Sequence, residues 1–536
     1  MMSWPRPEAV KLALCCLLMA VPMSAAAAPP ENFEARVEAL RKKVGVPGMA
    51  VTIVEGGMTT LARGFGVRKM GVTTPIDAAT IFPTGSTGKA FTSAGLALLV
   101  DQGRIKWDDR VIDHLPWFRM YDPYVTREIT VRDLMVHRSG LGLGAGDLLF
   151  VPRTNLSRRE SVKRLAFIKP ATSFRSGYAY DNVLYMVAGQ LIEEVTGQTW
   201  EAYTAEHLFK RAGMTVSTSD QDKRFATANR AFPHARLDGG LRGAGKIEHL
   251  DERDELGRNS APAGGLSSSA NDMARWLTIQ LARGKLPEGG RLFSEVQSAE
   301  MWNPVVLQPN RPPPEPLKAT QPRFSSYALG WDVRDYRGAR IVSHGGAVFG
   351  FQSTVVLIPD KNVGFSILTN SEDGHLIRGL TYELLDHYLE APARAPGASW
   401  PETWAAVSKT RVDAGLKALA ANRATPAKVG PSLPVVRYAG DYVDPWYGRI
   451  AVRPVGGKLT IDFKSTPRMA GTLEHWQYDS FVTRFDDKAI EPAYVTFGLD
   501  ADGKVERVTM KAVSPLADFS YDYHDLQFAP VAGGGQ

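Results

Sequence analysis

The stretch Phe82-Pro-Thr-Gly-Ser-Thr-Gly-Lys-Ala-Phe91 places a serine three residues before a lysine, at the predicted start of a helix. Residues three apart on a helix share one face, so the amine of Lys89 can reach the hydroxyl of Ser86. A serine hydroxyl is a poor nucleophile at its normal pKa, and a partly desolvated lysine with a lowered pKa can act as its base. Because Ser-x-x-Lys occurs only once in the chain, the sequence predicts one serine–lysine pair.

Tyr180-Asp-Asn182 stands at the start of a helix predicted over 182–195. A tyrosine held near two cations is expected to titrate below its usual pKa and to shuttle a proton. The amide of Asn182 can hold both Lys89 and a substrate carbonyl. Taken alone, however, this motif is more typical of a helix cap beside a core aromatic.

His344-Gly-Gly346 ends a predicted strand and opens a glycine-rich loop. Glycines there let a substrate lie along the strand edge as an added strand. The backbone N–H of Ala347, together with that of Ser86, can then form an oxyanion hole. Taken alone, a glycine-rich turn beside a solvent-facing histidine is the more common interpretation.

Length and composition indicate a globular protein with more than one domain. The chain has 536 residues, of which 44% are apolar and 22% charged, and it is too long for one ordinary core. Its formal charge of +6 comes from scattered Lys and Arg, so we expect no nucleic-acid partner.

Residues 1–28 have the pattern of a secretory signal peptide, with two basic residues flanking a short apolar run and a series of alanines after it. That run is too short to span a bilayer, and no later segment offers 18 uninterrupted apolar residues. Both cysteines, Cys15 and Cys16, would leave with the signal. We therefore expect export to the periplasm or beyond the cell, no integral membrane segment after signal removal, and no cysteine metal site.

The hydrophobic period divides the rest of the chain. Alternation of apolar and polar residues predicts a β-hairpin over 48–67, and a helical pattern prevails over about 104–300. The alternation returns in predicted strands at 328–333, 339–343, 352–359 and 363–370. A helix is predicted after them, over 376–389. If the early and late strands share one sheet, they enclose an inserted helical region, which is an α+β arrangement.

The C-terminal part has a different pattern. Residues 391–430 are predicted to be a linker or packed connector with one helix over 404–421. Residues 431–530 contain short, turn-bounded segments rich in Val, Thr, Tyr and Phe, which predicts a small all-β, barrel-like domain. This domain could cap a cleft, mediate oligomerisation or simply pack, and the sequence leaves the three alternatives open.

Ser86-x-x-Lys89, Tyr180-x-Asn182 and His344-x-Gly346, in this order, resemble the three motifs of the serine β-lactamase and penicillin-binding-protein superfamily. The resemblance is strongest to its class C-like branch of esterases and D-amino-acid peptidases. It covers residues 33–390, with further similarity at 134–141, 263–276, 327–331 and 345–351. It implies an antiparallel sheet flanked by helices, with an inserted helical subdomain. Residues 438–528 resemble the lipocalin-like domain that follows the hydrolase domain in some relatives.

The resemblance also implies a role for each motif residue and requires no cofactor or metal. The principal base stays open between Lys89 and Tyr180. A second possible triad, His137 with Ser139, is interpreted as a structural loop. The implied roles are nucleophile for Ser86, activating base for Lys89, second proton carrier for Tyr180, substrate orientation for Asn182, His344 and Gly346, and an oxyanion hole from the backbone of Ser86 and Ala347.

One departure from the family pattern bears on the substrate. β-Lactamases proper usually carry a lysine followed by threonine or serine where His344 and Gly345 stand here. Loss of that cation and hydroxyl argues against efficient β-lactam hydrolysis. We therefore predict a secreted serine hydrolase that acts on small esters, amides or D-peptides through an acyl-enzyme. The alternatives are a β-lactamase, or a penicillin-binding or sensor protein with little turnover.

Overall fold

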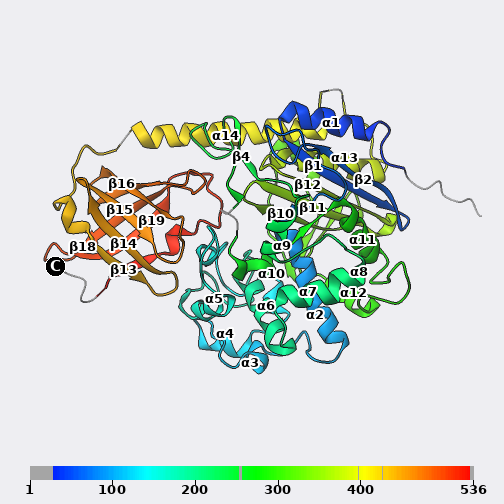
Figure 1. Cartoon of the computed structure of the whole chain (residues 1–536), viewed down its shortest axis with the longest axis horizontal. Helices are drawn as coiled ribbons and strands as arrows, with labels where there is room; N and C mark the ends of the chain where they lie inside the picture. Colours follow the sequence, from blue (N-terminus) through cyan, green and yellow to red (C-terminus); the bar gives the residue numbers. More distant parts are fainter. Residues whose placement is uncertain (1–27, 253–255, 396, 425, 532–536) are drawn as a thin grey trace, which may run out of the picture.

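The computed structural model describes residues 28–252, 256–395, 397–424 and 426–531. The predicted signal peptide therefore lies outside the described residues, except for Ala28. The chain forms a large α+β domain and a β-barrel, and the long helix α14 (Trp400–Ala424) runs from the first to the second (Figure 1). Among the described residues, no helix is both long and apolar enough to cross a bilayer.

An antiparallel, eight-stranded sheet forms the centre of the large domain. The predicted hairpin and the late strands share this sheet: Met49 pairs with Thr369, and Glu55 with Val363. The α+β prediction is thereby confirmed. In order across the sheet, the strands are β2 (Met58–Gly66), β1 (Gly48–Glu55), β12 (Val363–Thr369), β11 (Phe351–Ile358), β10 (Ala339–Val348), β9 (Asp332–Tyr336), β8 (Ser325–Tyr327) and β7 (Val306–Leu307).

Helices cover both faces of the sheet because both faces are apolar. On β1, Val51 and Ile53 point to one face and pack with α1 (Phe33–Val44) and α13 (Gly374–Tyr388). The alternate residues Ala50 and Val54 belong to the core cluster on the other face. All eight positions of β1 are buried, as expected for a central strand covered on both sides.

The inserted helical region packs on the second face and supports the site. Its longer helices are α2 (Lys89–Asp101), α6 (Val183–Thr196) and α11 (Ala270–Leu281), and α2 contacts both α6 and α10 (Ala261–Gly264). The remaining helices are α3 (Val111–His114), α4 (Pro123–Glu128), α5 (Arg158–Arg164), α7 (Trp200–Thr204), α8 (Lys210–Ala212), α9 (Gln221–Ala226) and α12 (Glu295–Met301). Two small two-stranded sheets complete it, β3 (Phe82–Pro83) with β6 (Ser267–Ser268) and β4 (His234–Arg236) with β5 (Ile247–His249).

Two predicted elements differ in detail. Most of the strand expected over 328–333 is instead the turn between β8 and β9, in which Gly330 has a φ of +80°, and only residues 332 and 333 belong to a strand. The helix expected to carry Ser86 begins only at Lys89. Ser86 itself lies in the preceding 3₁₀ turn η1 (Gly85–Gly88), which Gly85 enters with a φ of +54°.

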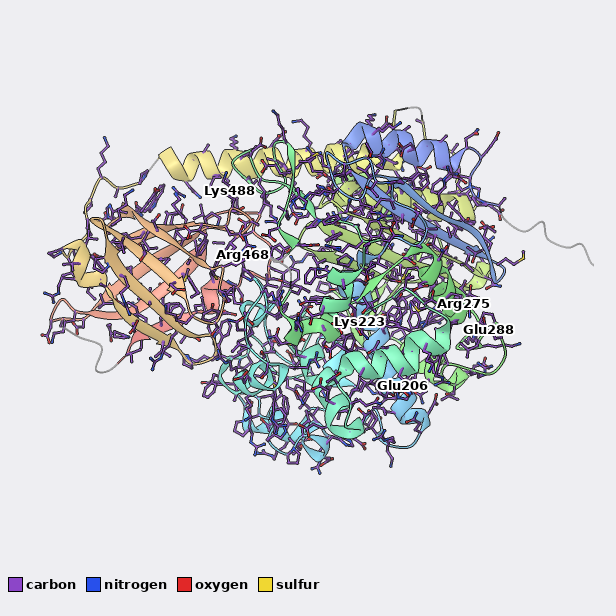
Figure 2. The ribbon with its side chains drawn as sticks, in the orientation of Figure 1. Glu206, Lys223, Arg275, Glu288, Arg468 and Lys488 are labelled. Carbon is purple, nitrogen blue, oxygen red and sulfur yellow. The ribbon has the colours of Figure 1, made fainter. Side chains whose placement is uncertain are left out.

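The C-terminal domain is a closed eight-stranded antiparallel barrel, as the sequence pattern predicted. It contacts the large domain through polar groups as well as apolar ones. Arg468 lies between the two parts (Figure 2) and pairs with Asp251 of the large domain and Asp487 of the barrel, each at 3.0 Å. The strands are β13 (Gly440–Asp444), β14 (Gly448–Val455), β15 (Lys458–Phe463), β16 (Ala470–Gln477), β17 (Ser480–Phe485), β18 (Ala493–Leu499), β19 (Val505–Ala512) and β20 (Gln527–Pro530).

Candidate active site

Ser86 and Lys89 are in direct contact at the junction of η1 and α2. Lys89 Nζ donates to Ser86 Oγ at 3.1 Å, although the two residues do not share a regular α-helical turn. Ser86 is half-buried, whereas Lys89 is fully buried. The hydroxyl is therefore reachable from the cleft while its neighbouring amine is shielded from solvent.

Two further acceptors fix the Lys89 amine. Nζ donates to Asn182 Oδ1 at 2.6 Å and to the Ala263 carbonyl at 3.0 Å. With Ser86, these acceptors match the three N–H bonds of an ammonium group. Burial lowers the pKa of Lys89 to about 7, against the opposing charges of Asp147 and Asp181. An amine with that pKa is substantially neutral near pH 7 and can accept a proton.

Tyr180 lies beside the same pair, as the motif order predicted. Its phenol interacts with the Ser86 side chain, and Lys89 Nζ lies 4.7 Å from the centre of its ring. The expected lowering of its pKa is wrong: burial raises the pKa of Tyr180 well above 10. His344 adds no cation beside Tyr180, because burial and the charge of Lys89 lower the pKa of His344 to about 3. The phenol is thus a proton donor at neutral pH.

The third motif lies on β10 next to η1. His344 Nδ1 is 2.6 Å from the Gly345 carbonyl, which can only accept, so Nδ1 carries the hydrogen and Nε2 accepts from Tyr327 Oη at 2.8 Å. His344 is buried and neutral rather than solvent-facing. Its ring centre is 6.4 Å from that of Tyr180.

The glycines bring β10 against the serine turn. A Cβ on Gly346 would lie 2.0 Å from the Thr84 carbonyl oxygen and 3.1 Å from the Ser86 amide nitrogen. A Cβ on Gly85 would lie 2.8 Å from the Ala347 nitrogen. Only glycine at positions 85 and 346 lets the two backbone segments approach this closely. The amide groups of Ser86 and Ala347 therefore lie at one edge of the cleft, as an oxyanion hole requires.

Sequence reasoning missed a buried acid and a segment of the barrel. Asp147 in η3 (Asp147–Leu149) accepts from Asn182 Nδ2 at 2.8 Å and from Ser520 Oγ at 2.7 Å. Phe519 packs edge-to-face on Tyr180, with ring centres 5.9 Å apart. Neither feature belongs to a recognisable motif, and Ser520 is more than 370 residues from its partner. The cleft, about 690 Å³, is lined by residues that include Ser86, Tyr180, Asn182, His344, Gly346, Ala347 and Asp518 to Ser520.

The loop with His137 and Ser139 supports the site from behind. His137 is fully buried and packs against Tyr180, with ring centres 4.3 Å apart. Ser139 Oγ donates to Asp181 at 3.2 Å. The hydrogen bonds of these two side chains are made to neighbouring loop groups and not to Ser86, which fits the structural interpretation of this loop.

Comparison with known proteins agrees with this geometry. The family model described as Beta-lactamase matches residues 33–389, and a domain of unknown function (DUF3471) matches residues 424–530. An unguisins hydrolase of Aspergillus campestris is 27% identical over 437 residues, which are 79% of this chain and 77% of that protein. Penicillin-binding protein 4 of Amycolatopsis lactamdurans is 27% identical over 384 residues, 71% of this chain and 94% of that protein.

A solved structure extends the similarity to the barrel. The octameric penicillin-binding protein homologue from Pyrococcus abyssi has a TM-score of 0.57 at 20% identity, and covers 90% of this chain and 98% of its own. The motif-based resemblance is thereby confirmed at the level of family and fold. The chain belongs to the beta-lactamase family, with the fold of its serine hydrolases and penicillin-binding proteins.

Proposed function

We propose that the protein is an exported serine hydrolase that cleaves ester or amide bonds through an acyl-enzyme on Ser86. The contact between Ser86 Oγ and the buried amine of Lys89 carries this proposal. With a pKa of about 7, Lys89 can take the serine proton at neutral pH without a further cofactor. The family supports hydrolysis, since one relative is named as a hydrolase.

In the proposed reaction, neutral Lys89 accepts the proton of Ser86 while Oγ attacks the substrate carbonyl. The amide groups of Ser86 and Ala347 stabilise the oxyanion. The protonated Tyr180 phenol donates to the leaving group and recovers its proton directly from the Lys89 ammonium. Neutral Lys89 then accepts a proton from the water that releases the acyl group and returns it to Ser86 Oγ. Asn182 and His344 orient the substrate, and Gly346 lets it approach β10. This assigns the principal base role to Lys89, because the raised pKa of Tyr180 disfavours a phenolate.

The preferred substrates are esters or D-amino-acid peptides rather than β-lactams. His344 is neutral at physiological pH, with its pKa lowered to about 3, and provides no cation for the carboxylate of a β-lactam. Export rests on the signal-like residues 1–28. Oligomerisation through the barrel is a further proposal, supported by the octameric state named for the Pyrococcus homologue.

One experiment tests the nucleophile and the substrate class. A fluorophosphonate probe should label the wild-type protein but not Ser86→Ala, and the substitution should reduce turnover by roughly 10³- to 10⁶-fold. In a panel of p-nitrophenyl esters, D-Ala-D-Ala peptides and nitrocefin, we expect nitrocefin to be the poorest substrate. Ser139→Ala is the matched control, because Ser139 lies near the site but its hydroxyl donates to Asp181 and not to Lys89. A folded protein that is not labelled, or that stops after one equivalent of product, would contradict the proposal.

A further inference from the structure

The C-terminal barrel reaches the catalytic lysine through a chain of buried hydrogen bonds. Ser520 Oγ donates to Asp147 Oδ2 at 2.7 Å, Asn182 Nδ2 donates to the same oxygen at 2.8 Å, and Lys89 Nζ donates to Asn182 Oδ1 at 2.6 Å. Asp147 is fully buried, and Asn182 is only 7% exposed. This series of hydrogen bonds therefore connects the two domains away from solvent, where each hydrogen bond is electrostatically strong.

The chemistry of these groups determines which way the Asn182 amide faces. When Asp147 is ionised its carboxylate can only accept, so in that state the NH₂ group of Asn182 must face it. The amide oxygen is then turned toward Lys89, as the amine requires. In the opposite rotamer the carboxylate would face an oxygen and the lysine would face an NH₂ group. Asp147 thus selects the amide orientation that holds the Lys89 amine beside Ser86.

A second barrel residue anchors the Asp147 turn. Asp522, itself fully buried, accepts from the Gly146 amide at 2.7 Å and from the Leu148 amide at 3.2 Å. These two amides flank Asp147 in the chain, so the barrel segment 518–522 holds both the backbone and the side chain of this residue. A close approach at Gly144, where a Cβ would lie 2.6 Å from the Phe519 carbonyl oxygen, leaves the segment little freedom to shift.

We infer that Asp147 is a positioning residue for Lys89, acting through Asn182, and that Ser520 of the barrel holds Asp147 in place. The barrel then completes the active site rather than only packing beside it. This inference rests on the proposed function and deepens it. The two residues belong to different family matches: Asp147 lies within the Beta-lactamase match over residues 33–389, and Ser520 lies within the DUF3471 match over residues 424–530.

The charge of Asp147 predicts the direction in which the pKa of Lys89 should change when Asp147 is replaced. Burial raises the pKa of Asp147 to about 7, so a fraction of it is ionised near neutral pH, and that charge favours the Lys89 ammonium. Removing the carboxylate should lower the pKa of Lys89 further. The hydrogen bond from Ser520 favours ionised Asp147, so its loss should act in the same direction but more weakly. The other titratable groups facing Lys89 or Asp147 are Asp181, Asp518, Asp522, His137, His344, Tyr180 and Tyr185.

The test compares Asp147→Asn and Ser520→Ala with the full-length wild-type protein. In the pH profile of kcat/KM for a p-nitrophenyl ester, we expect the acid limb of Asp147→Asn to move down by about 0.5 unit or more. The introduced amide can donate as well as accept, so the Asn182 amide is no longer held in one orientation, and kcat should fall about tenfold with little change in KM. Ser520→Ala should show a smaller shift of the same sign. Ser480→Ala is the matched control, because Ser480 lies in the same barrel with an exposed hydrogen bond to Thr496.

A readout without turnover separates this inference from the proposed function. The pKa of Lys89 can be followed by ¹⁵N NMR of its Nζ, assigned with Lys89→Arg. A lower Lys89 pKa in Asp147→Asn supports the inference even if the wild-type protein hydrolyses no ester, in which case only the proposed function fails. If both the acid limb and the Nζ titration of Asp147→Asn and Ser520→Ala match those of Ser480→Ala, the inference is overturned, whatever the change in kcat.

Discussion

At the scale of single residues, the decisive property of the site is the low pKa of one buried amine. If Lys89 must be neutral to accept the Ser86 proton, kcat/KM should rise with pH through an apparent pKa of about 7 and then level off. Lys89→Arg keeps the charge but cannot lose its proton. We expect the kcat/KM of this variant to lie roughly 10²- to 10⁴-fold below the wild-type plateau and to show no rise through pH 7, as measured by initial rates of ester hydrolysis from about pH 5 to 9.

The same profile also tests the two other titratable residues of the motifs. His344, with a pKa of about 3, and Tyr180, with a pKa well above 10, should add no ionisation between about pH 5 and 9. An acid limb near pH 7 that survives in Lys89→Arg would assign the titration to another group. Circular dichroism on both proteins checks that the arginine is accommodated.

Residue identities were predictable from the sequence, but their ionisation was not. The order and spacing of three short motifs predicted that Ser86, Tyr180 and His344 belong to one site. The lowered pKa expected for Tyr180 was wrong, because it assumed two cations and ignored burial. Whether His344 is charged depends on its burial and on the nearby charge of Lys89, neither of which a local pattern contains.

At the scale of elements, strand β10 and turn η1 fit together only where glycine leaves room. A Cβ on Gly346 would meet the Thr84 carbonyl at 2.0 Å and Ser353 Oγ at 2.4 Å, whereas a Cβ on the adjacent Gly345 would meet nothing within 4 Å. Gly346→Ala should therefore push β10 away from η1, reduce the free energy of unfolding by about 1–3 kcal/mol and displace the Ser86 turn. Urea unfolding and fluorophosphonate labelling measure the two effects.

Gly345→Ala is the matched control for this prediction. It adds the same methyl group to the same strand, on an exposed position, so stability should change by less than about 0.5 kcal/mol. Equal unfolding midpoints for the two variants would show that the contact between β10 and η1 is not tight. In general, hydrophobic period predicted the sheet strands well, and it failed where a glycine turn split β8 from β9 or where η1 replaced the first turn of a helix.

At the scale of the whole molecule, contacts between domains were beyond the reach of the sequence. Period and turn residues predicted a barrel-like C-terminal domain, and the structure shows a closed barrel. The hydrogen bond that Ser520 donates and the one that Asp522 accepts join residues more than 370 positions apart, and no spacing rule predicts such pairs. Of the three alternatives left open for the barrel, these contacts favour a role in the active site.

Arg242 connects the barrel to the edge of the cleft. It makes a two-pronged ion pair with Glu372, at 2.8 and 2.6 Å, and donates to the carbonyl of Ala489 in the barrel at 2.7 Å. Glu372 also accepts from the amide of Gly350, in the turn between β10 and β11. The side chains of Arg242 and Glu372 are only 15% and 21% exposed, so neither charge is well hydrated without its partner.

Removing Arg242 should therefore destabilise the docked molecule much more than removing a surface arginine. In Arg242→Ala, Glu372 remains largely buried without its cation, which should lower the free energy of unfolding by about 3 kcal/mol. Arg484→Ala is the matched control, since Arg484 pairs with Glu474 on the barrel surface and both side chains are about half exposed; its effect should stay below about 1 kcal/mol. Urea titrations followed by tryptophan fluorescence give both values. If the two variants unfold at the same midpoint, Arg242 does not hold the barrel against the cleft. If Arg242→Ala is destabilised and also loses esterase activity while Arg484→Ala retains it, docking of the barrel and function of the cleft depend on the same contact.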